Sequence, residues 1–274
     1  MPELPEVQTV VKFLRDDLIG DRINRIKPKW PKVLSNFRPS DISVKNNSSL
    51  ILDVTRRAKF IIFQFQSFII AIHLRMTGKL FFLNSGKIPK HTSAIIELDS
   101  GKKLIFEDTR KFGRIYFYND LKPIDERHGP EPLGENFTIN WFRKELNRRK
   151  RNIKALLLDQ SFLAGLGNIY VDESLWASAI HPYSISNAIP STKVSRLHFN
   201  IKRILQDAIN ANGTTIIDFS FLNGQSGRYS NELCIFGKVG KPCLQCGHTI
   251  KKHKISGRGT YVCGKCQTKY LKKR

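Results

Sequence analysis

Apolar residues recur at helical spacing close to the start of the chain. Pro5 precedes this stripe at a position where the first turn of a helix tolerates proline, and Gly20 follows it as a stop. The pattern predicts an amphipathic helix whose N-terminus points at Pro2 and Glu3, where the helix dipole favours negative charge. The apolar positions are Val7, Val10, Val11, Leu14 and Leu18.

From residue 50 to residue 118 the pattern changes to short runs rich in Ile and Phe. Runs of this length and composition are typical of strands. We expect a mainly antiparallel sheet sandwich in this part of the chain. The expected strands cover residues 60–65, 68–74, 93–98 and 113–118.

A segment rich in Pro and Gly, residues 123–134, interrupts the strand pattern, and helical periodicity follows it. The expected helices cover residues 141–150, 153–160, 169–179 and 193–211. The sequence therefore predicts an α+β protein with two domains and a terminal cysteine segment. The expected divisions are an N-terminal β-sandwich domain with flanking helices at 1–128, a linker at 129–134, a helical domain at 135–232 and the cysteine segment at 233–274.

The chain of 274 residues carries 46 Lys and Arg against 23 Asp and Glu, which gives a formal net charge of +23. The cationic residues recur along the whole chain instead of gathering in one tail or one amphipathic helix, which disfavours a membrane-surface protein. Basic proteins bind phosphate backbones by releasing condensed counterions, so nucleic acid is the expected partner. A metabolic enzyme for neutral solutes does not need this charge.

The chain contains no run of about 18 uncharged apolar residues, and charges occur throughout its first twenty residues. Neither a membrane span nor a secretory signal is expected, and we expect a cytoplasmic protein. No protein partner is indicated, so a monomer is the default expectation.

Four of the five cysteines are spaced as metal ligands. Cys243-x2-Cys246 and Cys263-x2-Cys266 are typical of a four-cysteine zinc site, in which each pair presents two thiolates to one tetrahedral ion. Four protein ligands leave no open position, so we expect one structural Zn²⁺ and a β-hairpin between the two pairs. Iron–sulfur ligation and free thiols are the alternatives. Cys234 is interpreted as a small packing residue.

Pro2 has a chemistry of its own once Met1 is removed, because it then carries a free secondary amine. An α-amino group titrates near ~8, so an appreciable share is unprotonated and nucleophilic at neutral pH. An iminium formed from a proline amine has no N–H proton to lose and stays charged, which makes it an electron sink. The adjacent Glu3 could exchange protons there. The alternative is that Pro2 and Pro5 only shape the terminus.

Three motifs together resemble the formamidopyrimidine-DNA glycosylases. They are Pro-Glu-Leu-Pro-Glu-Val at residues 2–7, Gly-Leu-Gly-Asn-Ile-Tyr at residues 165–170, and the terminal four-cysteine hairpin. The resemblance runs over essentially the whole chain. It implies a bilobal protein with a helix-two-turn-helix motif and a zinc hairpin in its second lobe, and duplex DNA in the cleft between the lobes. It also implies a bacterial protein that associates with the nucleoid while acting.

The implied activity is that of a bifunctional DNA glycosylase and AP lyase in base excision repair. The implied substrates are oxidised purines in duplex DNA, chiefly 8-oxoguanine and formamidopyrimidines. Pro2 would attack C1′ and form an iminium, Glu3 would protonate the sugar ring oxygen, and β and δ eliminations would cut the strand. Lys59 matches a lysine placed on a strand near the site, where an ammonium holds a flanking phosphate and assists departure of the base. Its alternative is an ordinary strand lysine.

Further residues match the DNA contacts of the family. A base that leaves the stack creates a hole in the duplex, and Met76, Arg110 and Phe112 match the side chains that fill it and wedge the neighbouring pairs. For Met76 and Phe112 the alternative is core packing, although both precede turn glycines. Asn168 matches a phosphate-binding residue, with a plain helix N-cap as its alternative.

Other matches concern the second lobe. Arg258 matches the arginine with which the zinc hairpin grips a phosphate, and Lys154 matches a lysine near the flipped nucleotide. The loop 222–229 matches a lesion-capping loop, with Ser226 and Tyr229 as contacts. The chain departs from the usual pattern at Gln8, Ala58, Ser230 and Phe236, where Glu, Gly, Gln and Tyr are frequent.

Two alternatives stay open at this point. An enzyme similar to endonuclease VIII would excise oxidised pyrimidines, but that branch usually begins Pro-Glu-Gly-Pro-Glu, whereas Leu4 stands in this chain. A non-catalytic zinc-hairpin DNA-binding protein would make Pro2 and Glu3 incidental. The change at Ser230, beside the capping loop, leaves the lesion preference open.

Overall fold

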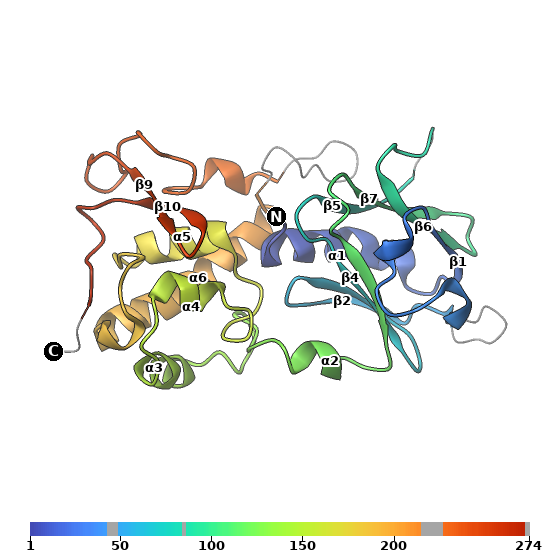
Figure 1. Cartoon of the computed structure of the whole chain (residues 1–274), viewed down its shortest axis with the longest axis horizontal. Coiled ribbons are helices and arrows are strands. Elements are labelled where there is room, and N and C mark those ends of the chain that lie inside the picture. The colour runs from blue at the N-terminus through green and yellow to red at the C-terminus, as the bar shows by residue number, and fades with distance from the viewer. Residues whose placement is uncertain (43–48, 84–85, 215–226, 272–274) are drawn as a thin grey trace. The chain divides into compact units, whose positions relative to one another are not determined.

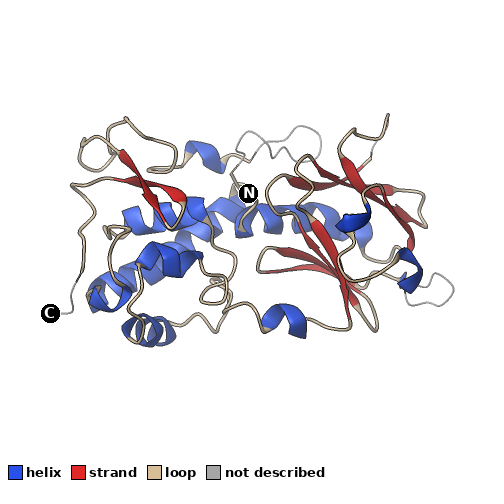
Figure 2. Ribbon diagram, in the orientation of Figure 1, coloured by secondary structure: helices blue, strands red, loops and turns tan. Residues whose placement is uncertain are grey.

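A computed structural model describes residues 1–42, 49–83, 86–214 and 227–271 (Figure 1). The chain forms two compact units. The first unit comprises residues 1–126 together with 211–228, and the second comprises residues 127–210 together with 229–274. Strands β1–β8 (residues 23–118) lie in the first unit, and helices α3–α6 (residues 139–210) lie in the second (Figure 2). This arrangement confirms the predicted α+β fold class.

Helix α1 (Leu4–Leu18) forms where the sequence pattern predicts it. Glu3 is its N-cap residue, and Pro5 lies in the first turn, where a missing backbone N–H breaks no helical hydrogen bond. One face of the helix is apolar and buried, with Val7 and Leu14 fully excluded from solvent. Burial of this face, more than helix propensity, holds the helix in place.

The first unit also contains two four-stranded antiparallel sheets. Their strands are β1 (Ile23–Pro28), β2 (Asp53–Arg57), β3 (Phe60–Gln64), β4 (Ile69–His73), β5 (Gly78–Phe82), β6 (Thr92–Leu98), β7 (Lys103–Asp108) and β8 (Arg114–Tyr118). One sheet has the order β1-β6-β7-β5 and the other β2-β3-β4-β8. The four strands predicted from Ile- and Phe-rich runs are confirmed as β3, β4, β6 and β8. The pattern does not indicate β1, β2, β5 or β7, three of which are edge strands with polar residues.

One cluster of buried apolar side chains joins α1 to both sheets. Ile61 and Phe63 of β3 belong to it, as do Ile96 of β6 and Phe106 of β7. Alternate residues of a strand face opposite sides, so these side chains fill the space between the sheets. Each such side chain stabilises the fold by about 1.5–3 kcal/mol. The sandwich core therefore positions α1, and with it the N-terminus of the chain.

The second unit contains the helices and a two-stranded hairpin. They are α3 (Ile139–Asn147), α4 (Ile153–Leu158), α5 (Asn168–Ala177), α6 (Ser191–Asn210), β9 (Lys251–Ile255) and β10 (Arg258–Val262). All four predicted helices are confirmed. The shorter elements of the chain are α2 (Lys122–Asp125), η1 (Pro31–Val33), η2 (Pro39–Asp41), η4 (Ser186–Ala188) and η6 (Tyr229–Asn231). No helix within the described residues is long and apolar enough to cross a membrane.

The predicted hairpin between the cysteine pairs is present as β9 and β10. Arg258 pairs with Ile255, which leaves a two-residue turn. Both turn residues have a positive φ, 49° at Ser256 and 75° at Gly257. This geometry is typical of the tight turns that match the twist of a hairpin. It places Arg258 at an exposed position directly after the turn.

The expected domain division places residues 211–228 in the helical domain. The described ends of this segment, residues 211–214 and 227–228, group with the first unit. Thr214 bridges to Arg228, and the Arg228 N–H donates to the carbonyl oxygen of Ala211 at 3.0 Å, so the two ends of the segment lie together. Thr214 also contacts Glu6 of α1. A hydrogen bond between residues so far apart in sequence leaves no local signal in either segment.

Candidate functional site

The N-terminus of α1 is held inside the first unit. Pro2 and Glu3 are both buried, and Glu3 exposes only 2% of its surface. The Glu6 carboxylate accepts the backbone N–H of Glu3 at 2.8 Å and the backbone N–H of Thr214 at 2.8 Å, one on each oxygen. Glu6 therefore joins the predicted catalytic residues to a distant segment. The sequence interpretation does not give Glu6 a role, although a glutamate three residues after an N-cap is a capping-box signal.

Lys59 lies on the turn between β2 and β3, so its expected place on a strand is wrong. Arg57 pairs with Phe60, which leaves Ala58 and Lys59 as the two turn residues. Lys59 exposes only 5% of its surface, although it lies on a turn. Lysine is almost never buried to this extent unless it is paired. The burial of Lys59 therefore marks this turn as a candidate site.

Ala58 explains why glycine is frequent at this turn. Its φ is 52°, a left-handed conformation that glycine adopts without strain and that a residue with a Cβ adopts at a cost. The chain meets the same backbone requirement with alanine. The presence of alanine instead of glycine at this position therefore preserves the turn geometry and the placement of Lys59.

Arg56 connects this turn to α1. Its Nε donates to Oε1 of Gln8 at 3.1 Å, and its Nη1 donates to the carbonyl oxygen of Ala58 at 2.9 Å. Two positions at which the chain departs from the family pattern, Gln8 and Ala58, thus contact one guanidinium. Because Gln8 is neutral, its contact with Arg56 is a hydrogen bond and not an ion pair. The bridge holds the Lys59 turn against the helix that carries the N-terminal residues.

Met76 and Phe112 are exposed at loop tips. Their exposed fractions are 38% and 48%, so neither side chain is part of the core. Arg110 is also exposed, and its guanidinium carbon lies 4.9 Å from the centroid of the Phe112 ring. Arg75, directly before Met76, has a φ of 56°, and its backbone N–H donates to Nδ1 of His73 at 3.0 Å. Large apolar side chains held out by ordered turns are suited to contact a partner.

Asn168 is the first residue of α5 and not its N-cap, which is Gly167. Its Nδ2 donates to the carbonyl oxygen of Gly259 on the hairpin at 2.9 Å. The loop before it is held by Gln160, whose Oε1 accepts the N–H of Gly165 at 3.0 Å and whose Nε2 donates to Leu166 at 2.8 Å. The N-cap alternative for Asn168 is therefore wrong. Gln160 is a loop-ordering residue that the sequence interpretation misses.

Lys154 is inside the second unit, where it pairs with Asp172. Its Nζ donates to Oδ1 of Asp172 at 2.6 Å, and both side chains are fully buried. Asp172 also accepts the backbone N–H of Tyr261 at 3.1 Å, and Lys154 reaches the carbonyl oxygen of Gly259 at 3.4 Å. Burial raises the pKa of Asp172 to about 6, against the opposing positive charge of Lys154. This pair holds the hairpin backbone beside Arg258.

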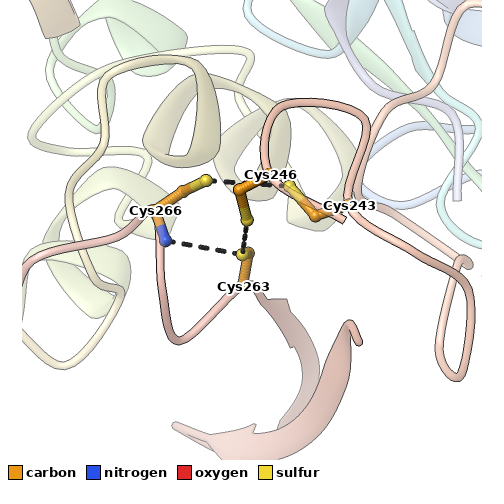
Figure 3. A group of neighbouring side chains, drawn as sticks. All are labelled: Cys243, Cys246, Cys263 and Cys266. Atoms are coloured by element: carbon orange, nitrogen blue, oxygen red, sulfur yellow. Dashed lines mark hydrogen bonds between the residues drawn. The ribbon is translucent and has the colours of Figure 1, made fainter. Parts of the chain in front are cut away.

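The four predicted zinc ligands come together at one point. Their sulfur atoms all lie within 4.8 Å of one another, and Figure 3 shows them pointing toward a common centre. The Sγ atoms of Cys243 and Cys266 are 3.8 Å apart, and those of Cys246 and Cys263 are 3.5 Å apart. Thiolates about 2.3 Å from a tetrahedral zinc ion lie roughly 3.8 Å from each other, whereas bonded sulfurs lie at about 2.05 Å. The geometry fits one Zn²⁺ and no disulfide.

Helix α5 supports the zinc segment with two more side chains. The Trp176 Nε1 donates to Sγ of Cys243 at 3.4 Å. Glu173 exposes 3% of its surface, and its carboxylate accepts the successive backbone N–H groups of residues 234–236 at 2.8–3.1 Å. Burial raises the pKa of Glu173, and these hydrogen bonds oppose the shift. Cys234 thus lies in a turn bound by Glu173, a role that its spacing does not reveal.

Tyr229 is buried, with an exposed fraction of 6%, and its ring centroid lies 6.0 Å from that of Tyr170. Burial raises the pKa of its hydroxyl well above the ordinary value. The predicted contact of Tyr229 with the lesion stays a prediction. Ser226 and the rest of the predicted loop 222–226 lie outside the described residues.

Three family models match successive parts of the chain. The formamidopyrimidine-DNA glycosylase N-terminal domain matches residues 1–115, and the formamidopyrimidine-DNA glycosylase H2TH domain matches residues 128–220. The zinc finger found in FPG and IleRS matches residues 240–269.

Full-length relatives agree with these matches. The chain is 41% identical to a formamidopyrimidine-DNA glycosylase of Pelotomaculum thermopropionicum, over 97% of this chain and 99% of the relative. It is 42% identical to that of Protochlamydia amoebophila, over 98% and 100%. Among solved structures, a Lactococcus lactis FPG mutant in complex with Fapy-dG containing DNA superposes with a TM-score of 0.90 at 36% identity, covering 98% of this chain and all of that one. MutM in complex with carbocyclic 8-oxo-G containing DNA gives 0.89 at 36% identity, covering 98% and 100%.

The sandwich, the helical unit and the four-thiolate hairpin, taken with these matches, define a DNA glycosylase of DNA repair that carries a zinc finger. The chain belongs to the formamidopyrimidine-DNA glycosylase family. The predicted family, the predicted enzyme class and the predicted zinc segment are confirmed. The alternative of a non-catalytic DNA-binding protein is therefore wrong.

Proposed function

We propose that this protein is a bifunctional DNA glycosylase and AP lyase that removes oxidised purines from duplex DNA with the amine of Pro2 as nucleophile. The burial of Pro2 and Glu3 at the N-terminus of α1, held by Glu6, carries the proposal. A nucleophile excluded from water at a fixed position is suited to attack a sugar carbon. The chemistry requires removal of Met1, which frees the secondary amine.

The proposed reaction proceeds in steps in which one bond forms as another breaks. The Pro2 nitrogen attacks C1′, the base leaves with the electrons of the C1′–N bond, and the proton that the Pro2 nitrogen loses balances the proton that the base takes up. Glu3 then protonates O4′ as the C1′–O4′ bond opens, and the nitrogen lone pair forms the C=N bond of an iminium. The iminium makes the 2′ proton acidic; its loss forms a C2′=C3′ bond and expels the 3′ phosphate. A second elimination, with loss of the 4′ proton, expels the 5′ phosphate, and water releases Pro2.

Several charged and apolar side chains are proposed to hold the DNA. Lys59, buried on its turn, is proposed to place an ammonium near the flanking phosphate, where low solvent exposure strengthens its effect. Met76, Arg110 and Phe112 are proposed to fill the hole that the extruded nucleotide leaves. The proposed phosphate-binding residues on the second unit are Asn168 and Arg258.

Lys154 and Tyr229 are buried, and both are proposed to support DNA-contacting segments. A direct phosphate contact by Lys154 requires its ammonium to leave a buried ion pair, and such a charge is costly to separate from its partner. Its proposed role is therefore to hold the backbone beside Arg258 through Gly259. Tyr229 is proposed to anchor one end of the capping loop. The zinc ion, when bound, supplies no catalytic step and stabilises the hairpin that presents Arg258.

The test is borohydride trapping on a duplex that contains 8-oxoguanine opposite cytosine. The wild-type protein is expected to form a covalent adduct with DNA, and Pro2→Gly is expected to reduce it severely. Pro5→Ala, which changes a neighbouring proline, is the matched control and is expected to trap normally. Trapping by Pro2→Gly at the wild-type rate contradicts the proposal, as does full activity of a protein whose mass shows a retained Met1.

The substrate class is tested separately, because an enzyme similar to endonuclease VIII would use the same amine. Relatives solved with Fapy-dG and 8-oxo-G containing DNA support purine lesions. Single-turnover excision from duplexes with 8-oxoguanine, formamidopyrimidine or an oxidised pyrimidine gives the comparison. Faster excision of the oxidised pyrimidine refutes the purine assignment but leaves the Pro2 chemistry intact.

A further inference from the structure

Asp108 connects the two loops that carry Met76, Arg110 and Phe112, which are exposed. These loops are residues 75–77, between β4 and β5, and residues 109–113, between β7 and β8. The Asp108 side chain exposes only 1% of its surface. We propose that Asp108 is a positioning residue that holds Arg110 and Phe112 ready for insertion into duplex DNA. The inference rests on the proposed function and extends it to a residue outside the reacting groups.

The hydrogen bonds of the Asp108 carboxylate define this role. Its Oδ1 accepts the backbone N–H of Arg110 at 3.1 Å and the hydroxyl of Thr77, and its Oδ2 accepts the backbone N–H of Gly113 at 2.7 Å. The Arg110 N–H also reaches the Thr77 hydroxyl oxygen at 3.2 Å. Thr77 directly follows Met76. One buried carboxylate therefore fixes both ends of the loop 109–113 and ties it to the loop that presents Met76.

The carbonyl groups of the same loop are held from the other side by Arg114. Its Nη1 donates to the carbonyl oxygens of Lys111 at 3.0 Å and Gly113 at 2.7 Å, and its guanidinium carbon lies 4.7 Å from the centroid of the Trp30 ring. Lys111 adopts a φ of 57°. The loop thus has fixed partners for its donors and for its acceptors. A loop ordered in this way loses little conformational entropy when it contacts a ligand.

Packing also restricts the backbone conformation of the loop 109–113. A Cβ added at Gly113 would lie 2.4 Å from Cζ of Phe106, a core residue of β7. The backbone of the loop therefore lies directly on the sandwich core, while Phe112, one residue earlier, is 48% exposed. An apolar side chain that wedges between base pairs must overcome their stacking energy. When the loop that carries it is already rigid, no further conformational entropy is lost in ordering that loop. The hydrogen bonds of Asp108 are the polar interactions that keep this loop rigid.

This role predicts a difference between two substrates. In a duplex, the extruded nucleotide leaves a hole that the wedge must fill. In a single-stranded oligonucleotide with an abasic site, there is neither a stacked partner nor an orphaned base. Loss of loop position is therefore expected to slow the reaction on the duplex and to spare the reaction on the single strand. General damage to the fold would slow both.

The experiment uses two isosteric variants. Asp108→Asn replaces one carboxylate oxygen with an NH2 group that faces a backbone N–H or a hydroxyl, and Thr77→Val removes the hydroxyl alone. Thr77→Ser keeps the hydroxyl, and Asp99→Asn makes the same charge change at an exposed position of the same unit. The readouts are single-turnover excision of 8-oxoguanine from a duplex and borohydride trapping on a single-stranded abasic oligonucleotide.

Asp108→Asn and Thr77→Val are expected to slow duplex excision roughly tenfold to a hundredfold, as small misplacements of positioning groups do. Their single-strand trapping, and both reactions of the two control variants, are expected to stay within about twofold of wild type. Equal losses on both substrates, or normal duplex excision, overturn the positioning role. If Asp108→Asn does not fold, Thr77→Val decides the question. A wild-type protein that traps on neither substrate refutes the proposed function, and the present inference with it.

Discussion

The carboxylate of Glu6 accepts the backbone N–H of Thr214 at 2.8 Å, although the two residues are 208 positions apart in sequence. Its other oxygen accepts the N–H of Glu3 at 2.8 Å. Gly213 lies directly against this carboxylate, since a Cβ added there would come within 3.0 Å of Oε1 of Glu6. One buried side chain therefore determines where the N-terminus lies relative to the segment that returns from α6.

Glu6→Gln is expected to weaken this arrangement while it keeps the side-chain volume. The amide places an NH2 group against one of two backbone N–H donors, so a buried hydrogen bond to a charged group, worth about 1.5–3 kcal/mol, is lost. We expect a lower melting temperature and a trapping rate reduced about tenfold, because Glu3 and Pro2 lose a fixed position. Glu126→Gln, at an exposed site of the same unit, is the control. Wild-type stability together with wild-type trapping contradicts this role of Glu6.

Trp176 is expected to report zinc binding by its fluorescence. Its indole N–H donates to Sγ of Cys243 at 3.4 Å, so loss of the ion changes the charge next to the ring. Chelation is expected to shift or quench the tryptophan emission of the wild-type protein. The chain has 3 tryptophans, so Trp30→Phe should keep the response and Trp176→Phe should remove it. An unchanged response in Trp176→Phe refutes the coupling.

The Asp172–Lys154 pair is expected to make stability depend on pH between about pH 4 and 6. Burial raises the pKa of Asp172 from 3.8 to about 6 in the folded protein, with Lys154 opposing the shift. The folded state therefore binds the proton more tightly than the unfolded chain. The stability that this proton contributes is fully present below pH ~4 and is lost as the pH rises through ~6.

Asp172→Asn removes this titration, although it also leaves the Lys154 ammonium without its carboxylate. The free energy of unfolding of the wild type minus that of the variant is expected to fall by about 2 to 3 kcal/mol between pH 4 and pH 7. Denaturant unfolding at both pH values measures it. A difference that does not change with pH shows that Asp172 does not titrate in this range.

The hairpin lysines are expected to contribute to the salt dependence of DNA binding. From Leu233 to the end the chain contains no Asp or Glu, and Lys251 and Lys254 are exposed on β9. Each lost phosphate contact lowers the slope of log K against log salt by about 0.9. Changing Lys251 and Lys254 to Gln is expected to flatten the slope for an undamaged duplex, whereas Lys122→Gln in the first unit is the comparison. A slope equal to that of the wild type refutes the contact.

Features of this protein that depend on neighbouring residues can be predicted from its sequence. The stripe from Val7 to Leu18 predicts α1, because a helix repeats its faces within a few residues. The paired cysteines predict the zinc site, since each pair must present two thiolates from one short turn. The resemblance carried by residues 2–7 and 165–170 identifies the family. Each of these signals lies within a short segment of the sequence or in the order of such segments along the chain.

Contacts between polar groups that are far apart in the sequence become visible in the folded protein alone. Lys59 lies on a turn because the pairing of Arg57 with Phe60 sets the end of each strand, and strand register is a property of two segments. Lys154 is fully buried and forms an ion pair with Asp172 on another helix. Glu6 and Thr214 are hydrogen-bonded across 208 positions of sequence, a contact that no local pattern records. A buried charge needs a partner, and the fold supplies that partner without leaving a periodic pattern in the sequence.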